Sequence, residues 1–158
     1  MSRSPRTKAL VAEPSFGTTL DFLRLLWALD HALQKRSKRL AVKRGITGPQ
    51  RFALRMIDHA PGIGAGALAR ALKMHPSTLT GVLRRLERAG LITRQSVSGD
   101  QRRATLVLTR AGRTKVRNRT GTIEQSVSAV LGRTPAAELK RVSTFLQTLV
   151  AAIDPDQD

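Results

Sequence analysis

Apolar residues recur at helical spacing through most of the chain, and a single stretch changes to the two-residue period of a strand. The first periodic segment runs from Thr18 to Arg44 without internal Gly or Pro and stops at Gly45, a residue suited to ending a helix. It carries two apolar stripes, one of Leu23, Leu26, Leu33 and Leu40, the other of Phe22, Leu25 and Leu29. This width predicts a long helix with more than one neighbour.

A second helix is predicted from a capping signal. Thr47 and Gln50 have the Thr-x-x-Gln spacing of a capping box, with Pro49 in the first turn. Pro61 and Gly62 end the segment after about three turns. The residues expected to face inward are Phe52, Ala53, Met56 and Ile57.

The stretch from Ile63 to Thr109 combines a short helix, a tight turn, a second helix and a ribbon. Residues 65–73 form the first helix, and residues 76–88 form the second, with His75 as N-cap and an apolar stripe of Leu79, Val82, Leu83 and Leu86. Residues 91–95 and 102–109 then read as paired strands whose tip spans residues 98–103. The pattern predicts a helix-turn-helix with a wing.

Two further helices complete the expected fold. One begins near Thr109 and continues to about Leu131, with a narrow apolar seam at near-heptad spacing, and the other opens at Thr134-Pro135. Their apolar faces and the spare stripe of the first helix exceed what one small core can cover. We therefore predict a mainly α protein with a small β-wing that forms a dimer.

Charge points to the partner. The 158 residues carry a formal net charge of +17, which predicts a polyanionic partner: nucleic acid, an anionic membrane or an acidic protein. The helix-turn-helix pattern favours nucleic acid. Aromatic residues make up only 3%, which disfavours base-stacking platforms for RNA or single strands.

The same composition argues against several kinds of chemistry. The sequence has no cysteine, and its three His residues lack zinc-ligand spacing, so we predict no metal and no cofactor. No carboxylate pair, nucleophile-base set or phosphate-cradling glycine loop supports an enzyme. No apolar run is long enough to span a bilayer, which makes a cytoplasmic protein without a membrane partner the expectation.

The outward face of the helix over residues 76–88 is the main candidate site. Hydroxyl and Arg side chains of this kind reach base edges and phosphates in a major groove, whereas a solvated surface is the competing interpretation. Gly81 lies in the helix interior, where glycine is less stable than Ala by roughly 1 kcal/mol. A glycine at this position is explained if the helix approaches a partner closely. The candidates are Ser77, Thr78, Thr80, Gly81, Arg84 and Arg85.

The wing supplies the second candidate site. Asp100 lies two residues before Arg102, where it can orient the guanidinium toward a narrow minor groove, and Arg103 follows. A turn-stabilising Asp beside solvated Arg residues is the alternative.

These motifs together resemble the MarR family of transcriptional regulators, over about residues 18–153. The resemblance is carried by residues 40–50, Leu68-Ala69-Arg70-Ala71-Leu72, Pro76-Ser77-Thr78-Leu79-Thr80, residues 85–92, Asp100-Gln101-Arg102-Arg103 and Leu108-Thr109-Arg110-Ala111-Gly112. It implies a homodimer that binds a pseudopalindromic operator in double-stranded DNA as a repressor and is released by a small aromatic or anionic effector. Cysteine-based oxidant sensing, known in the family, is excluded here.

Composition at the ends, the predicted elements and the resemblance together divide the chain. Residues 1–15 would be a mobile basic tail, 16–46 a dimerisation helix, 47–109 the winged helix-turn-helix lobe, 110–153 the remaining dimerisation helices, and 154–158 a C-terminal tail. The dimer would use the first, fifth and sixth expected helices. Trp27, His31 and Met56 lie near the family's effector pocket, although core packing for Trp27 and Met56 and a satisfied His31 compete with that role. A ligand-independent architectural or constitutive DNA binder is the alternative function.

Overall fold

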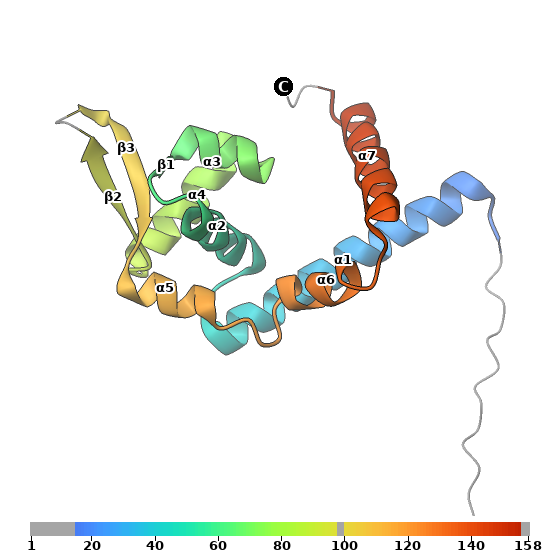
Figure 1. Cartoon of the computed structure of the whole chain (residues 1–158), viewed down its shortest axis with the longest axis horizontal. Coiled ribbons are helices and arrows are strands. Elements are labelled where there is room, and N and C mark those ends of the chain that lie inside the picture. The colour runs from blue at the N-terminus through green and yellow to red at the C-terminus, as the bar shows by residue number, and fades with distance from the viewer. Residues whose placement is uncertain (1–14, 98–99, 156–158) are drawn as a thin grey trace, which may run out of the picture. The chain divides into compact units, whose positions relative to one another are not determined.

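The computed structural model describes residues 15–97 and 100–155, without the side chains of residues 96–103 (Figure 1). The helices of this part are α1 (Thr18–Arg44), α2 (Gly48–His59), α3 (Ala65–Leu72), α4 (Pro76–Arg88), α5 (Arg110–Arg117), α6 (Ile123–Leu131) and α7 (Ala136–Ile153). The strands are β1 (Ile63–Gly64), β2 (Ile92–Val97) and β3 (Asp100–Leu108). The predicted class, mainly helical with a small β-wing, is confirmed.

One apolar core joins α2, α3, α4, α5 and the sheet. The predicted stripe of α4 is buried, and Leu83 and Leu86 are 1% and 0% exposed. They meet Leu54 of α2, Leu68 of α3 and Val116 of α5 in the same cluster. Burial of large aliphatic side chains at about 25 cal/mol per Å² is the main force that holds these elements together.

The sheet is antiparallel, in the order β1-β3-β2. Ile63 of β1 pairs with Leu106, and Ile92 of β2 pairs with Leu108. Leu106 and Leu108 are buried, which confirms the alternation predicted for the return strand. Strand β1 was not predicted, because two residues are too few to show a strand period.

Helix α2 begins as predicted but turns a different face inward. Thr47 and Gln50 form the reciprocal capping box. Phe52, predicted to face the core, is 47% exposed, and Leu54 and Arg51 are buried instead at 0% and 1%. The prediction for Phe52 is wrong because it assigned the aromatic residue inward and the cationic one outward, whereas Arg51 finds polar partners inside the protein.

The helix predicted from Thr109 to Leu131 is two helices. Helix α5 ends at Arg117 and α6 begins at Ile123, with Thr122 as its N-cap. Gly121 has a φ of +71°, a left-handed conformation that glycine adopts readily and that a continuous helix does not allow. The expected fifth helix therefore corresponds to α5 and α6, and the expected sixth to α7.

A close backbone approach fixes the start of α5. The Thr109 side chain accepts from the N–H of Gly112 at 3.1 Å and donates to the Gly90 carbonyl at 2.7 Å. A Cβ on Gly112 would lie 2.0 Å from the Leu91 carbonyl oxygen. The Leu-Thr-Arg-Ala-Gly motif thus ties α5 to the segment that leads into β2.

Helix α1 belongs to two compact units. The described residues up to Ala32 form one unit, and the described residues from Leu33 onward form the other. In the first unit, Asp21 accepts from the Ser15 hydroxyl at 2.8 Å and from the Phe16 N–H at 3.2 Å. These two hydrogen bonds lower the pKa of Asp21, and the bond from Ser15 has the larger effect. The negative charge of Asp21 is also favourable at the N-terminal end of a helix.

The last two helices keep their apolar faces exposed in the single chain. Neither α6 nor α7 has a buried residue, and Val130, Val142 and Ile153 are 65%, 49% and 67% exposed. Across the described residues, none of the helices is apolar over enough length to traverse a lipid bilayer.

Candidate nucleic-acid interface

The helix-turn-helix is built around the start of α4. Lys73 ends α3 in a left-handed conformation, with φ 50° and ψ 46°, and so turns the chain sharply. His75 is the N-cap of α4, as predicted, and its Nδ1 accepts from the Ser77 N–H at 3.3 Å. Pro76 occupies the first turn, where a missing N–H costs little.

The outer face of α4 has the predicted composition. Because residues three or four positions apart share a side of a helix, Ser77, Gly81, Arg84 and Arg88 lie opposite the buried Leu stripe. The candidates Ser77, Thr78, Thr80, Arg84 and Arg85 are all exposed, and Gly81 is half-buried. The structure therefore brings six of the predicted residues onto one accessible surface.

Nothing inside the described chain requires a glycine at position 81. A Cβ built there meets no atom within 4 Å, and Gly81 does not have a positive φ. The residue nevertheless lies in the middle of a helix, where alanine is favoured by about 1 kcal/mol. Its absent side chain leaves a shallow position at the centre of the exposed face.

Two of the candidate hydroxyls already have partners within the helix start. The Thr80 hydroxyl donates to the Pro76 carbonyl at 2.8 Å, and the Ser77 hydroxyl lies 2.7 Å from Nδ1 of His75. Because its proton is used within the helix, the exposed Thr80 hydroxyl is left as a hydrogen-bond acceptor. The base edges of a major groove include donors that match such an acceptor.

The ribbon of β2 and β3 is joined to α4 by an ion pair between Arg94 and Glu87. The positive charge of Arg94 neutralises the negative charge of Glu87, which lies on the same helix as Arg84, Arg85 and Arg88. Sequence reasoning missed the pair because its partners lie seven residues apart in different elements.

The wing candidates lie on β3, and their side chains fall outside the described part. Asp100 pairs with Val97 across the ribbon, and a bulge separates this pair from Ser96. Arg102 and Arg103 follow within the same strand. The backbone therefore places all three near the end of the ribbon, as predicted.

The effector candidates have different surroundings. Trp27 is 70% exposed and His31 is exposed one turn further along α1, whereas Met56 is partly buried against the core of the lobe. Core packing therefore describes Met56 but not Trp27 within the single chain. For Trp27 and His31, nothing among the described residues of the first unit shows a ligand role.

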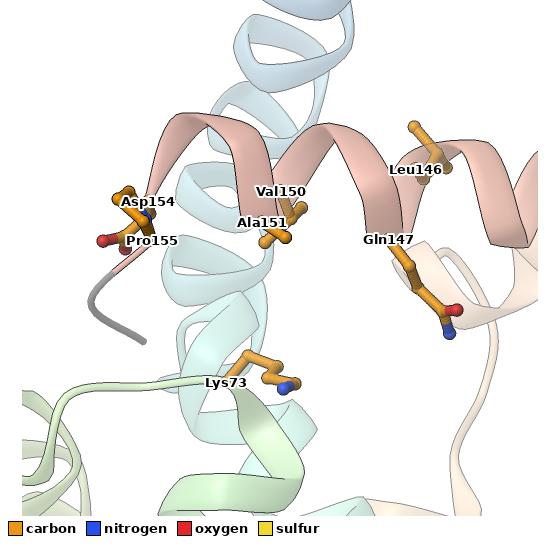
Figure 2. Close-up of a pocket in the computed structure, with 7 residues that line it drawn as sticks. All are labelled: Lys73, Leu146, Gln147, Val150, Ala151, Asp154 and Pro155. Atoms are coloured by element: carbon orange, nitrogen blue, oxygen red, sulfur yellow. The ribbon is translucent and has the colours of Figure 1, made fainter. Parts of the chain in front are cut away.

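A separate hollow of about 470 Å³ lies between the end of α3 and α7 (Figure 2). Lys73 borders it on one side, and apolar α7 residues such as Val150 and Ala151 border the other. None of the three effector candidates lines it. Its lining also includes the polar side chains of Gln147 and Asp154.

Comparison with known proteins identifies a family and individual relatives with similar amino-acid sequences. A profile of the MarR family matches residues 46–104. An HTH-type transcriptional repressor of Mycobacterium tuberculosis is 30% identical over 105 residues, which are 66% of this chain and 76% of that protein. The organic hydroperoxide resistance transcriptional regulator of Bacillus subtilis is 30% identical over 132 residues, with coverages of 82% and 86%.

Solved structures show the same fold. The MepR protein of Staphylococcus aureus, in a complex with DNA, aligns with a TM-score of 0.71 at 20% identity and covers 87% of this chain and 99% of its own. A MarR protein of Peptoclostridium difficile aligns with a TM-score of 0.70 at 18% identity, with coverages of 91% and 94%. At this identity the likeness concerns the arrangement of helices and wing.

Proposed function

The chain belongs to the MarR family, and from this membership we propose that it is a homodimeric transcriptional repressor that binds a pseudopalindromic site in double-stranded DNA. The family and the relatives named as repressors support regulation of transcription. Occupation of a promoter by the dimer would exclude the transcription machinery. Such a protein would act in the cytoplasm, with the DNA that it binds.

The observation that carries this proposal is the outer face of α4. Its opposite side is fixed in the core by Leu79, Leu83 and Leu86, so the exposed hydroxyl and Arg groups are held on a rigid support. An α-helix fits the major groove of B-form DNA, where its N-terminal residues contact base edges. We assign Ser77, Thr78, Thr80 and Arg84 to base contacts and Arg85 to phosphate, with Gly81 allowing close approach.

The wing would provide the second contact. We propose that Arg102 enters the minor groove, that Asp100 orients it, and that Arg103 contacts the phosphate backbone. Residues 47–109 would then form the DNA-binding lobe, and residues 16–46 and 110–153 the dimerisation region, between short tails at residues 1–15 and 154–158.

Release by a small molecule completes the proposed function. One relative, from Escherichia coli, is named homoprotocatechuate degradative operon repressor and is 30% identical over 112 residues. A small aromatic or anionic effector is therefore the class that we propose, with Trp27, His31 and Met56 as candidate contacts. A thiol-based response to peroxides is excluded because the sequence has no cysteine.

Selection of bound sequences from random duplexes tests the proposal. We expect an inverted repeat whose half-site centres lie about one helical turn, roughly 10 bp, apart. Arg84→Ala should reduce affinity for the selected site by about tenfold to 100-fold and relax base preference at one position, since a bidentate contact contributes about 1–3 kcal/mol of discrimination.

Lys140→Ala is the matched control for Arg84→Ala. Lys140 is exposed on α7, and its substitution removes the same formal charge without touching α4. It should leave base preference unchanged. Equal effects of the two substitutions would mean that Arg84 contributes charge alone and would contradict its assignment to base contacts.

A second function, architectural binding without sequence preference, is favoured by the net charge of +17. Counterion release alone would give strong and steeply salt-dependent binding to any duplex. A selection that yields no shared motif, together with equal affinity for unrelated duplexes, would establish this alternative and exclude the repressor.

A further inference from the structure

The core of the winged lobe ends at a defined place along the chain. Val116 of α5 is its last buried apolar residue, at 1% exposure, and α6 and α7 contain no buried residue. Residues 118–122 join these two regions. We name this segment, with the side chains that bind it, the α5–α6 joint.

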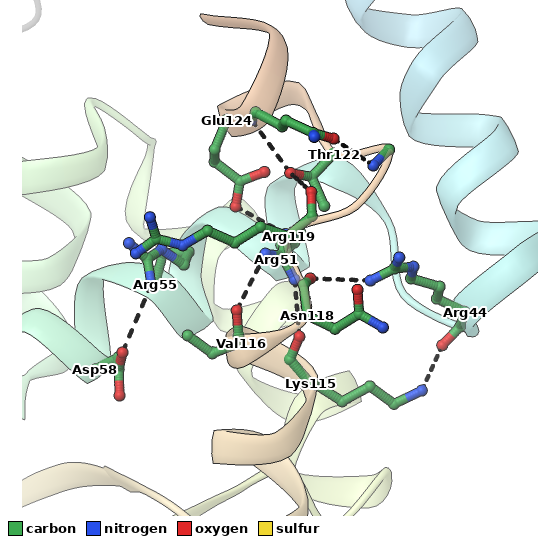
Figure 3. A network of polar contacts seen from close by, with 12 residues as sticks. Arg44, Arg51, Arg55, Asp58, Lys115, Val116, Asn118, Arg119, Thr122 and Glu124 are labelled. Carbon is green, nitrogen blue, oxygen red and sulfur yellow. Dashed lines mark hydrogen bonds and ion pairs between the residues drawn. The ribbon is translucent and has the colours of Figure 1, made fainter. Parts of the chain in front are cut away.

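A buried arginine of α2 holds the lobe side of the joint (Figure 3). Nη1 of Arg51 donates to the Lys115 carbonyl at 2.8 Å, and Nη2 donates to the Val116 carbonyl at 3.2 Å. These carbonyls lie in the last turn of α5, where intrahelical donors are lacking and the helix dipole is negative. A cation is therefore well placed at this end of α5.

The same guanidinium reaches across the joint to α6. Its Nε lies 2.7 Å from Oε1 of Glu124, in the first turn of that helix. The Arg51 side chain is only 2% exposed. Burial lowers the pKa of Arg51, while the neighbouring Glu124 carboxylate opposes this shift by favouring the charged form.

A second arginine, from the C-terminal end of α1, holds the joint itself. Arg44 donates to the Asn118 carbonyl at 2.9 Å and to the Thr120 carbonyl at 2.5 Å, and Lys115 donates to the Arg44 carbonyl at 2.6 Å. Buried or charge-assisted hydrogen bonds of this type depend strongly on direction. Together they favour one geometry of the joint, because a shift of α6 would take the Glu124 carboxylate away from the buried Arg51 guanidinium.

We infer that Arg51 is a positioning residue which, through Glu124 and the α5–α6 joint, fixes the DNA-binding lobe on helices α6 and α7 and thereby sets the half-site spacing that the dimer accepts. The inference rests on the proposed function, since it needs two lobes joined by a dimer. Arg51 contacts no DNA in this role. Its effect is on the separation of the two α4 helices.

The experiment uses the full-length chain and the duplex that the wild type itself selects. The two half-sites are moved apart or together in single base-pair steps, each of about 3.4 Å along the helix axis with a matching rotation. Affinity is measured for every spacing and for a single half-site. The wild type should prefer one spacing sharply.

Arg51→Met and Glu124→Gln are the test variants. Each should bind the single half-site within about twofold of wild type but lose about tenfold or more on the optimal spacing, because a loosely held second lobe has a lower effective concentration at its half-site. Their spacing profiles should also be broader. Glu124→Gln keeps the two Arg51 bonds to α5, and so it decides the matter if Arg51→Met does not fold.

Arg55→Met is the matched control, because Arg55 lies one turn along α2 and pairs with Asp58 of its own helix at 3.7 Å. Its spacing profile should equal that of wild type. A wild-type spacing profile in a folded Glu124→Gln would overturn the inference while leaving the proposed function intact. Failure of the wild type to prefer any spacing would instead refute the proposed function, and the inference with it.

Discussion

At Gly81, the residue that suits DNA binding is not the one that gives the most stable helix. The space around its Cα is open within the described chain, so packing does not explain a glycine there. Gly81 lies among the exposed residues Ser77, Arg84 and Arg88, so contact with a binding partner can explain the glycine. Removing the side chain at the centre of a helix face lets the backbone approach a groove more closely.

We therefore expect Gly81→Ala to raise the free energy of unfolding by about 0.4–1 kcal/mol and to weaken binding to the selected duplex. A tenfold loss of affinity would correspond to about 1.4 kcal/mol. Chemical denaturation and fluorescence anisotropy measure the two effects. Gly66→Ala in α3 is the control, because Gly66 is exposed and its added methyl meets only the end of Arg70 at 3.9 Å. If both variants bind DNA as wild type does, Gly81 has no role in close approach.

The burial of a residue could be predicted where its hydrophobicity and its helical spacing indicated the same face, and not where the two disagreed. The four apolar residues of α4 were placed correctly because no polar residue competes for the same face. In α2, the helical spacing allows Arg51 to face inward, but we predicted that Phe52 would do so because it is hydrophobic. Arg51 is buried in the structure, and Phe52 is exposed. The partners that make Arg51 tolerable inside, Lys115, Val116 and Glu124, are far away in sequence.

At the scale of elements, capping signals were more informative than apolar spacing. Thr47-x-x-Gln50 marked the start of α2 correctly, and the same spacing recurs in Thr122-x-x-Gln125. There the side chain of Gln125 accepts from the Gly121 N–H at 2.6 Å, and Thr122 caps α6. The near-heptad seam, in which Val116 and Ile123 are seven residues apart, concealed this second start and suggested one continuous helix.

The α6 start gives a prediction for an element boundary. Thr122 is fully buried, donates to the Arg119 carbonyl at 2.8 Å and accepts from the Gln125 N–H at 3.3 Å. Thr122→Ala should lower the free energy of unfolding by about 1 kcal/mol, the usual effect of losing an N-cap. Thermal or denaturant unfolding measures this change.

Thr120→Ala is the control within the same joint. The Thr120 side chain is exposed, and the residue contributes its backbone carbonyl to Arg44, so the change should stay within about 0.5 kcal/mol. An equal effect of the two substitutions would show that the cap does not fix where α6 begins.

At the scale of the whole molecule, charge and apolar surface make separate contributions. The excess of 28 Lys and Arg over 11 Asp and Glu predicted a polyanionic partner but no position for it. The helix-turn-helix supplied the position. Apart from the family resemblance, the association of two chains could be predicted only from surplus apolar area, since no single residue of α6 or α7 identifies its contact in a second copy.

Helices α6 and α7 place that surplus on the surface. Val130, Val142 and Ile153 are all at least 49% exposed, and soluble proteins rarely leave large contiguous apolar patches uncovered. Burial against a second copy would remove this area from water and would carry the two lobes on one frame. We expect Val142→Glu to shift the protein from dimer to monomer in sedimentation velocity measured at micromolar concentration.

The consequence for DNA distinguishes dimerisation from folding. A folded Val142→Glu monomer should keep its affinity for a single half-site and lose the gain from the second, because the two lobes are no longer joined. Thr144→Glu introduces the same charge at an exposed position nearby on α7 without replacing an apolar residue, and it should remain dimeric. A dimeric Val142→Glu with wild-type binding to the full site would mean that this face of α7 is not the interface, and the covering of Val130 and Ile153 would then need another partner.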